Sequence, residues 1–174
     1  MRIEIRTATA YETREVGRAL APLLRPADAL ALTGELGAGK TTFVQGIAKG
    51  LGFDGNVVSP TFMLVREYQG RLRIFHVDVY RLERVQDVLD LGLDDATAEG
   101  GVLLVEWGDA IEGLLPPDHL VVTLTVPRDD ETRSIVFDGV GGSWRIRWEQ
   151  LERLLEPFGG LGPPGPPGRW GVLV

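Results

Sequence analysis

Residues 28–42 read DALALTGELGAGKTT, and this stretch decides the fold of the chain. The apolar run over 29–32 has the length of a buried strand, and the pattern over 43–49 is that of a helix. Between them, residues 34–41 match G-x-x-x-x-G-K-[ST], the Walker A pattern or P-loop, in the strand-then-helix context that this motif requires. The stretch therefore predicts an α/β fold of the P-loop NTPase type, with a mainly parallel sheet flanked by helices.

The residues of this loop suit phosphate binding. Glycines let the backbone approach an anion closely, and loop amides and the start of the following helix then point at phosphate oxygens. Lys40 would place a positive charge on the β- and γ-phosphates, and the Thr41 hydroxyl would complete an oxygen shell around Mg²⁺. We therefore expect ATP or ADP with Mg²⁺ as cofactors. The residues that we assign to nucleotide binding are Glu35, Leu36, Gly37, Ala38, Gly39, Lys40, Thr41 and Thr42.

Composition bounds the class of protein and its partners. A chain of 174 residues with 44% hydrophobic side chains supports one domain with a proper core. A net charge of −7 argues against autonomous binding of nucleic acid, and the absence of cysteine excludes thiolate chemistry. The sequence has no apolar signal core at its start and no apolar run of transmembrane length. We expect a cytoplasmic protein without membrane contact.

The rest of the chain indicates further strands and helices. The expected strands cover 2–6, 61–68, 72–78, 102–107, 119–126, 134–137 and 144–148, and the further helices cover 84–93, 110–115 and 149–156. The second and third of these strands flank a short turn and predict an antiparallel hairpin, and the last three make the C-terminal part strand-rich. We assign residues 1–158 to a P-loop ATPase domain and 159–174 to a Pro/Gly-rich tail, which its composition predicts to be flexible.

Two carboxylates follow apolar runs and are candidates for the metal side of the site. Glu106 and Asp78 each end an expected strand, and side chains at the carboxyl ends of parallel strands lie where ligands bind in open α/β sheets. We assign both, with Lys40, as candidate catalytic residues. The alternatives are a surface carboxylate for Glu106 and an ion pair with Arg81 for Asp78.

Ser59 and Thr61 come soon after the expected P-loop helix. Hydroxyls in such a loop are placed to sense the γ-phosphate and its Mg²⁺, so we assign both residues to a switch loop; a Ser-Pro turn that opens a strand is the alternative. His76 lies two residues before Asp78, on the same side of an expected strand, and we interpret it as structural. Two histidines without cysteine argue against a structural zinc site.

Four short motifs occur in order along the chain: GELGAGKTT at 34–42, VSPTF at 58–62, HVDVYR at 76–81 and EWG at 106–108. Together they resemble the TsaE family (also called YjeE), the small bacterial ATPase of tRNA threonylcarbamoyladenosine biosynthesis. The resemblance covers roughly residues 7–126 and is far more specific than the P-loop alone. It does not extend to the Pro/Gly tail, to which no function is transferred.

The resemblance implies an ATPase that works with the partners TsaD and TsaB. These partners install the threonylcarbamoyl group on the adenosine beside the anticodon of tRNAs that read codons beginning with A. The ATPase binds the pair and is needed for repeated turnover, but it is not the transferase. By motif position, the implied roles are phosphate and Mg²⁺ binding for Lys40 and Thr41, a place beside the phosphates for Thr42, a switch-like loop for Thr61, an acidic pair near metal and water for Asp78 and Glu106, and a place flanking the site for Trp107. We assign Thr41 and Glu106 as metal ligands, while the sequence leaves open which of the two carboxylates binds the metal and which positions water.

Two other functions stay open at the level of sequence. A small P-loop phosphotransferase would need arginines on a lid, and no compact lid insertion is visible. A nucleotide-dependent binding module with little turnover is partly compatible with the family resemblance, since ATP binding could control docking on the partners. No arginine finger is identifiable, so we expect low ATPase activity of the chain alone and contact with tRNA only through the partner complex.

Overall fold

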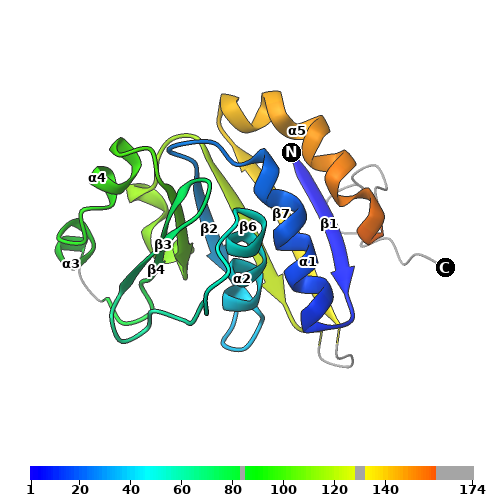
Figure 1. The fold of residues 1–174 in the computed structure, drawn as a ribbon, viewed down its shortest axis with the longest axis horizontal. Coiled ribbons are helices and arrows are strands. Elements are labelled where there is room, and N and C mark those ends of the chain that lie inside the picture. The colour runs from blue at the N-terminus through cyan, green and yellow to red at the C-terminus, as the bar shows by residue number, and fades with distance from the viewer. Residues whose placement is uncertain (83–84, 128–131, 160–174) are drawn as a thin grey trace.

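One mixed sheet of seven strands, in the order β1-β7-β6-β2-β5-β4-β3, forms the centre of the molecule (Figure 1). The computed structural model describes residues 1–82, 85–127 and 132–159. The elements are β1 (Arg2–Thr7), α1 (Ala10–Leu20), η1 (Ala21–Leu23), β2 (Ala29–Thr33), α2 (Lys40–Gly50), β3 (Val65–Gln69), β4 (Arg73–Asp78), α3 (Val85–Leu89), α4 (Leu93–Ala98), β5 (Val102–Glu106), η2 (Gly108–Leu114), β6 (His119–Thr125), β7 (Arg133–Val140), α5 (Gly142–Leu155) and η3 (Glu156–Phe158). The helices η1, η2 and η3 are of the 3-10 type.

The central strands β6, β2, β5 and β4 run parallel to one another, whereas β7 and β3 run antiparallel to their neighbours. Parallel strands end at the same edge of a sheet, so the carboxyl ends of β2, β5 and β4 meet. Leu32 of β2 pairs with Glu106 of β5, which in turn pairs with Asp78 of β4. The P-loop leaves β2 at this edge and leads into α2. This arrangement confirms the α/β fold of the P-loop type.

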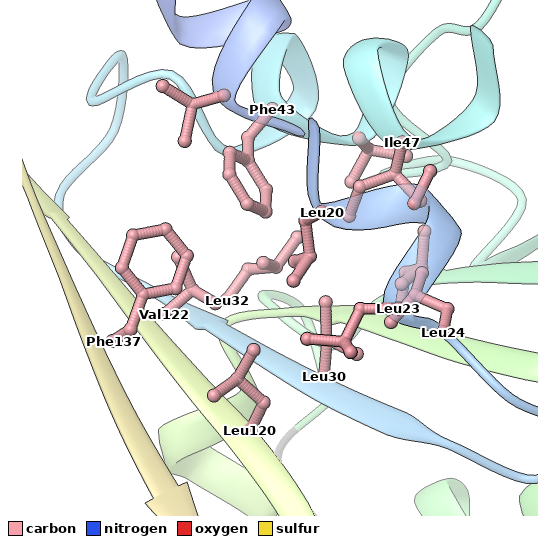
Figure 2. Packing of buried hydrophobic residues seen from close by; sticks show 14 of the residues in the cluster. Leu20, Leu23, Leu24, Leu30, Leu32, Phe43, Ile47, Leu120, Val122 and Phe137 are labelled. Atoms are coloured by element: carbon pink, nitrogen blue, oxygen red, sulfur yellow. The ribbon is translucent and has the colours of Figure 1, made fainter. Parts of the chain in front are cut away.

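Helices α1, α2 and α5 cover one face of the sheet and enclose the larger apolar core. Figure 2 shows Phe43 and Ile47 of α2 and Leu20 of α1 pointing toward the sheet, where Leu30 and Leu32 of β2 lie. All five side chains are fully buried, and burial of a side chain of this size contributes about 1.5–3 kcal/mol. The strand and the helix on either side of the P-loop are therefore anchored in the same core.

The other face of the sheet carries α3, α4 and η2, with α4 against β5 and η2 against β2. Val88 of α3, Ala96 of α4 and Ile111 of η2 pack there against Phe75 of β4 and Leu103 of β5. Strands β4 and β5 are packed from both faces, since alternate residues of each strand belong to the larger core and to this smaller cluster.

The strand expected over 144–148 is wrong, because these residues belong to helix α5. The five letters WRIRW alternate as a strand would, and a window this short also fits a helix. Over the longer segment the buried residues recur at helical spacing. They are Trp144, Arg147, Trp148, Leu151 and Leu155.

The strand expected over 61–68 begins four residues late. Residues 61–64 form a turn, in which the N–H groups of Met63 and Leu64 donate to the Pro60 carbonyl at 2.8 and 2.6 Å. The hairpin of β3 with β4 is confirmed. The helix expected over 84–93 is interrupted, since α3 ends at Leu89 and α4 begins at Leu93.

Two expectations fall on residues outside the described ones. Residue 84, the expected start of that interrupted helix, is the first, and the tail from residue 160 onward is the second. In the part of the chain that is described, no helix is both long enough and apolar enough to span a membrane.

Candidate nucleotide-binding site

The P-loop joins β2 to α2 through a backbone that glycine adopts most easily. Gly34, Gly37 and Gly39 have φ angles of 125°, 81° and 108°, in a region that side chains disfavour. At Gly34 a Cβ would lie 2.0 Å from the carbonyl oxygen of Leu124, so β6 closes directly against the loop. Gly39 precedes α2 and offers no side chain as a cap. The N–H groups of the first helical turn are left for an anion.

Lys40 opens α2 with its ammonium group turned into the loop. The side chain is buried, and Nζ donates to the carbonyls of Gly34 and Glu35 at 2.6 and 3.0 Å. It also lies 3.8 Å from the centre of the Trp107 ring. Burial lowers the pKa of Lys40, while the negative charge of nearby carboxylates, Glu106 foremost, opposes this shift. Such a desolvated cation gains strongly from contact with an anion.

Glu106 ends β5 and reaches the first turn of the P-loop helix. The residue is 4% exposed, and its Oε1 accepts a hydrogen bond from Oγ1 of Thr41 at 2.7 Å. The same oxygen lies 2.8 Å from Nε2 of His76. The carboxylate therefore connects α2 to strand β4.

Asp78 ends β4 and holds the loop that the sequence analysis assigned as a switch. Its Oδ2 accepts hydrogen bonds from Thr61 at 2.7 Å and from Ser59 at 3.1 Å. Its Oδ1 accepts from the N–H of Tyr80 at 2.9 Å. Asp78 is 3% exposed, so both oxygens are engaged inside the protein. Ser59 and Pro60 lead into the turn of residues 61–64, and the hydroxyls of Ser59 and Thr61 reach the sheet through this carboxylate.

The alternatives raised from the sequence for these carboxylates are not found. Both Asp78 and Glu106 are buried, so Glu106 is not a surface carboxylate. The guanidinium of Arg81 lies 4.6 Å from the centre of the Phe62 ring, and among the described residues Asp78 forms no ion pair with Arg81.

The aromatic rings of Trp107 and Tyr80 line the site on the side of Lys40. Trp107 has a φ of 63°, which is unusual for a residue with a bulky side chain. Its ring lies 4.8 Å from that of Tyr80, centre to centre, and it covers the Lys40 ammonium group. The left-handed backbone turn after β5 thus places an aromatic ring against the P-loop lysine.

The structure brings the assigned P-loop, switch-loop and strand-end residues to one edge of the sheet. Leu36 differs from the buried residues of the site because it is 82% exposed. Two further residues lie at the site without having been assigned to it from the sequence: Tyr80, and His76, which was interpreted as structural and contacts Glu106. The spacing of His76 and Asp78 put both side chains on one side of the strand, but strand order and register make Glu106 the neighbour.

The donor set fits a magnesium ion bound together with a nucleotide. Among the described residues, no group of three or more acidic, histidine or cysteine side chains could hold a metal by itself. Mg²⁺ bound with a nucleotide needs fewer protein ligands, because it keeps waters and takes phosphate oxygens. The oxygens of Thr41 and Glu106, 2.7 Å apart beside the P-loop, are ligands of the right chemistry for that ion.

The strand, P-loop and helix at the centre of a parallel sheet, with a carboxylate at the end of the next strand, define a P-loop NTPase fold. The crystal structure of Bacillus subtilis YdiB has this fold. It matches with a TM-score of 0.77 at 38% sequence identity, over 88% of this chain and 95% of that chain.

The chain belongs to the TsaE family. The family model for "Threonylcarbamoyl adenosine biosynthesis protein TsaE" matches residues 7–135. A Bacillus subtilis relative named tRNA threonylcarbamoyladenosine biosynthesis protein TsaE is 44% identical, over 85% of this chain and 92% of its own. The relative of that name in Treponema pallidum is 39% identical, over 70% of this chain and 90% of its own. The resemblance seen in the four motifs is confirmed.

Proposed function

We propose that this protein is a Mg²⁺-dependent ATPase of the cytoplasm that supports N6-threonylcarbamoyladenosine modification of tRNA by acting on a TsaD–TsaB-like complex. Membership of the TsaE family supports the modification pathway. The hydrogen bond between Thr41 and Glu106, at 2.7 Å, carries the enzymatic part. It joins a P-loop hydroxyl to a buried strand-end carboxylate beside the place where the terminal phosphates of ATP would lie.

Lys40 would exchange partners when the nucleotide binds. In the structure its ammonium donates to two loop carbonyls, and the β- and γ-phosphates offer it stronger, charged acceptors. The loop amides and the first turn of α2 would bind the remaining phosphate oxygens. A bound Mg²⁺ supplies charge neutralisation on the transferring phosphoryl group, and Thr41 and Glu106 are the residues that would hold it.

Asp78 and Glu106 take different parts in this proposal. Both oxygens of Asp78 are occupied by the switch loop and by the N–H of Tyr80, so Asp78 positions that loop. Glu106 contacts the P-loop helix and acts on the metal and on water. When ATP binds, Ser59 and Thr61 would give up their hydrogen bonds to Asp78 and turn toward the γ-phosphate side of the site. This change would couple the nucleotide state to the position of the loop.

Two observations support a dependence on partners. No arginine among the described residues hydrogen-bonds or pairs with Lys40, Asp78 or Glu106, and an arginine supplied in trans can be worth about 10³–10⁵ in rate. Phe62 and Met63, directly after Thr61, are 84% and 62% exposed. The switch loop therefore presents an apolar surface whose position would depend on the nucleotide, as a docking element requires.

The test combines purified protein with TsaD and TsaB. Phosphate release is measured for the chain alone and for the mixture, and a pull-down is run with an ATP analogue, with ADP and without nucleotide. We expect slow release alone, faster release with partners, and partner binding that depends on nucleotide. A gel shift at physiological salt should show weak tRNA binding by the chain alone.

The same assays separate the alternatives. A phosphorylated acceptor in place of free phosphate would indicate a phosphotransferase. Nucleotide-dependent docking without phosphate release would indicate a binding module. Partner binding that is indifferent to nucleotide and to Lys40→Ala, or tight tRNA binding by the isolated chain, would contradict the proposal.

A further inference from the structure

His76 is buried within the sheet, on the strand next to its edge strand β3, directly behind the site. It belongs to β4, is 0% exposed, and pairs with Arg66 of β3 and Leu104 of β5. Its Nε2 lies 2.8 Å from Oε1 of Glu106. Its other ring nitrogen, Nδ1, is buried and finds no hydrogen-bond partner among the described residues. A buried polar atom without a partner costs stability, so stability alone does not explain a histidine at this place.

The partners of the ring assign its proton. Oε1 of Glu106 is an acceptor, and an unprotonated Nε2 would face it with a second lone pair. The hydrogen therefore lies on Nε2, and Nε2 donates to the carboxylate. A hydrogen on Nδ1 would be a buried donor without an acceptor, which is the costlier arrangement. The tautomer with its hydrogen on Nε2 is the form that satisfies this network.

Within the described part of the chain, the carboxylate of Glu106 receives both of its hydrogen bonds on Oε1, from His76 and from Thr41, and none on Oε2. We propose that His76 is a positioning residue for the ATPase reaction, and that its Nε2–H holds Oε1 of Glu106 so that Oε2 is left for the metal and its water. This inference rests on the proposed function. The Thr41 hydroxyl would be shared with the metal, whereas the contact with His76 does not depend on a ligand.

Three variants of His76 separate positioning from packing. In His76→Gln the side-chain amide nitrogen reaches the place of Nε2, in His76→Asn it stops one carbon short, and His76→Leu fills the space without a donor. The measured quantity is the factor by which Mg²⁺ strengthens binding of AMP-PNP. We expect His76→Gln to stay within about threefold of wild type, and the other two variants to lose about tenfold or more of that factor, the usual effect of losing a contact behind a metal ligand.

A double-mutant cycle with Glu106→Gln shows whether His76 acts through Glu106. If it does, His76→Leu costs about tenfold in the wild-type background and less than about threefold in the Glu106→Gln background. Equal losses in both backgrounds, or an Asn variant as good as the Gln variant, would overturn the proposal. With partners added, His76→Leu should lower kcat and leave the KM for ATP nearly unchanged.

A readout without nucleotide keeps this inference separate from the proposed function. The chain has two histidines, so ¹⁵N-histidine labelling gives two ring systems, and His76→Gln assigns them. We expect His76 to be the Nε2–H tautomer at neutral pH and Glu106→Gln to shift its Nε2 signal. An Nδ1–H tautomer refutes the anchoring. The expected tautomer together with a wild type that shows no Mg²⁺ effect and no phosphate release would refute the proposed function and leave the His76–Glu106 contact standing.

Discussion

Strand β2 has a buried carboxylate network at each end, and the two networks differ in how their charge is balanced. At the amino end, Asp28 accepts hydrogen bonds from Nη1 and Nη2 of Arg147 in α5 at 2.6 and 2.8 Å. At the carboxyl end, Asp78 and Glu106 of the neighbouring strands accept from hydroxyls, a backbone N–H and an imidazole. Among the described residues, neither of these two pairs with a lysine or arginine.

We call the first network closed, because a cation within it balances its carboxylate, and the second open, because its carboxylates have no such partner in the described part of the chain. Each nitrogen of the Arg147 guanidinium donates a hydrogen bond, to Asp28, to the Leu23 carbonyl or to Ser143, and one cation balances one carboxylate. The other end has two buried carboxylates, while its nearest cation, Lys40, donates to carbonyls instead. A surplus of buried negative charge is costly unless something compensates it. The open end is the one that a metal–nucleotide complex would complete.

Breaking the closed network should give the largest effect on stability. Arg147→Met removes one partner of a pair in which Arg147 is 1% exposed, so Asp28 is left as a buried, uncompensated charge. We expect a loss of about 3–5 kcal/mol in the free energy of unfolding, measured by urea denaturation. The matched control is Arg153→Met in the same helix, whose ion pair with Glu149 is exposed and should cost less than about 1 kcal/mol.

The double variant Asp28→Asn/Arg147→Met sharpens this result. Removing both charges avoids the unpaired carboxylate, so the double variant should be more stable than Arg147→Met alone. A double variant that is less stable than the single one would mean that packing of the Arg147 stem, and not charge balance, dominates at this end.

At the open end, Lys40→Ala should abolish function without harming the fold. We expect phosphate release with partners to fall at least about a hundredfold, as when a group that stabilises transition-state charge is removed. The melting temperature of the nucleotide-free protein should stay the same or rise slightly, because burial disfavours this ammonium. The control is Lys49→Ala, at the chain's only other lysine, which lies at the surface and pairs with Asp54. An unfolded Lys40→Ala protein, or one with normal turnover, would contradict the comparison.

The difference between variants of the two carboxylates at the open end should be smaller than the difference between Lys40→Ala and wild type. Glu106→Gln should lower phosphate release at least about tenfold while changing AMP-PNP affinity without Mg²⁺ by less than about threefold, because it acts on metal and water. Asp78→Asn replaces one of the two accepting oxygens with an amide NH₂ donor, so the switch-loop hydroxyls and the N–H of Tyr80 can no longer both keep their acceptor. It should weaken nucleotide-dependent docking on the partners more than it slows hydrolysis. If Glu106→Gln hydrolyses ATP normally and Asp78→Asn does not, the two roles are reversed.

The open end was predictable from the sequence because its residues lie in short, local patterns. Spacing and glycine content predict the strand, P-loop and helix of 28–49. The two carboxylates are predicted from their place after apolar runs. The strand register was not predictable, and it is the register that places Asp78 beside Glu106. For the same reason the contact of His76 with Glu106 was missed.

The closed end was not predictable at all. Asp28 and Arg147 are separated by 119 positions, and no local pattern relates a residue before β2 to a late helix. The alternation of 144–148 in fact favoured a strand. That assignment would have removed the α-helical turn in which the Arg147 guanidinium donates back to the Ser143 carbonyl. Helix α5 is identified only by its full length and by the core it covers.

The smallest predicted effect is the pH dependence of stability that Lys40 causes in the nucleotide-free protein. Two influences oppose each other there, since burial lowers its pKa while Glu106 and Asp78 raise it, and burial prevails.

A lysine with a lowered pKa in the folded state binds fewer protons than the unfolded chain between that pKa and its ordinary value of about 10.4. Wild type should therefore gain stability relative to Lys40→Met as the pH rises through this window, and the penalty should be fully present below it. Urea unfolding of both proteins from pH 7 to pH 10 measures the difference, in which the other titrating groups cancel. If wild type instead loses stability relative to Lys40→Met as the pH rises, the carboxylates outweigh burial, and the open end balances more of its own charge than the comparison with Asp28 and Arg147 implies.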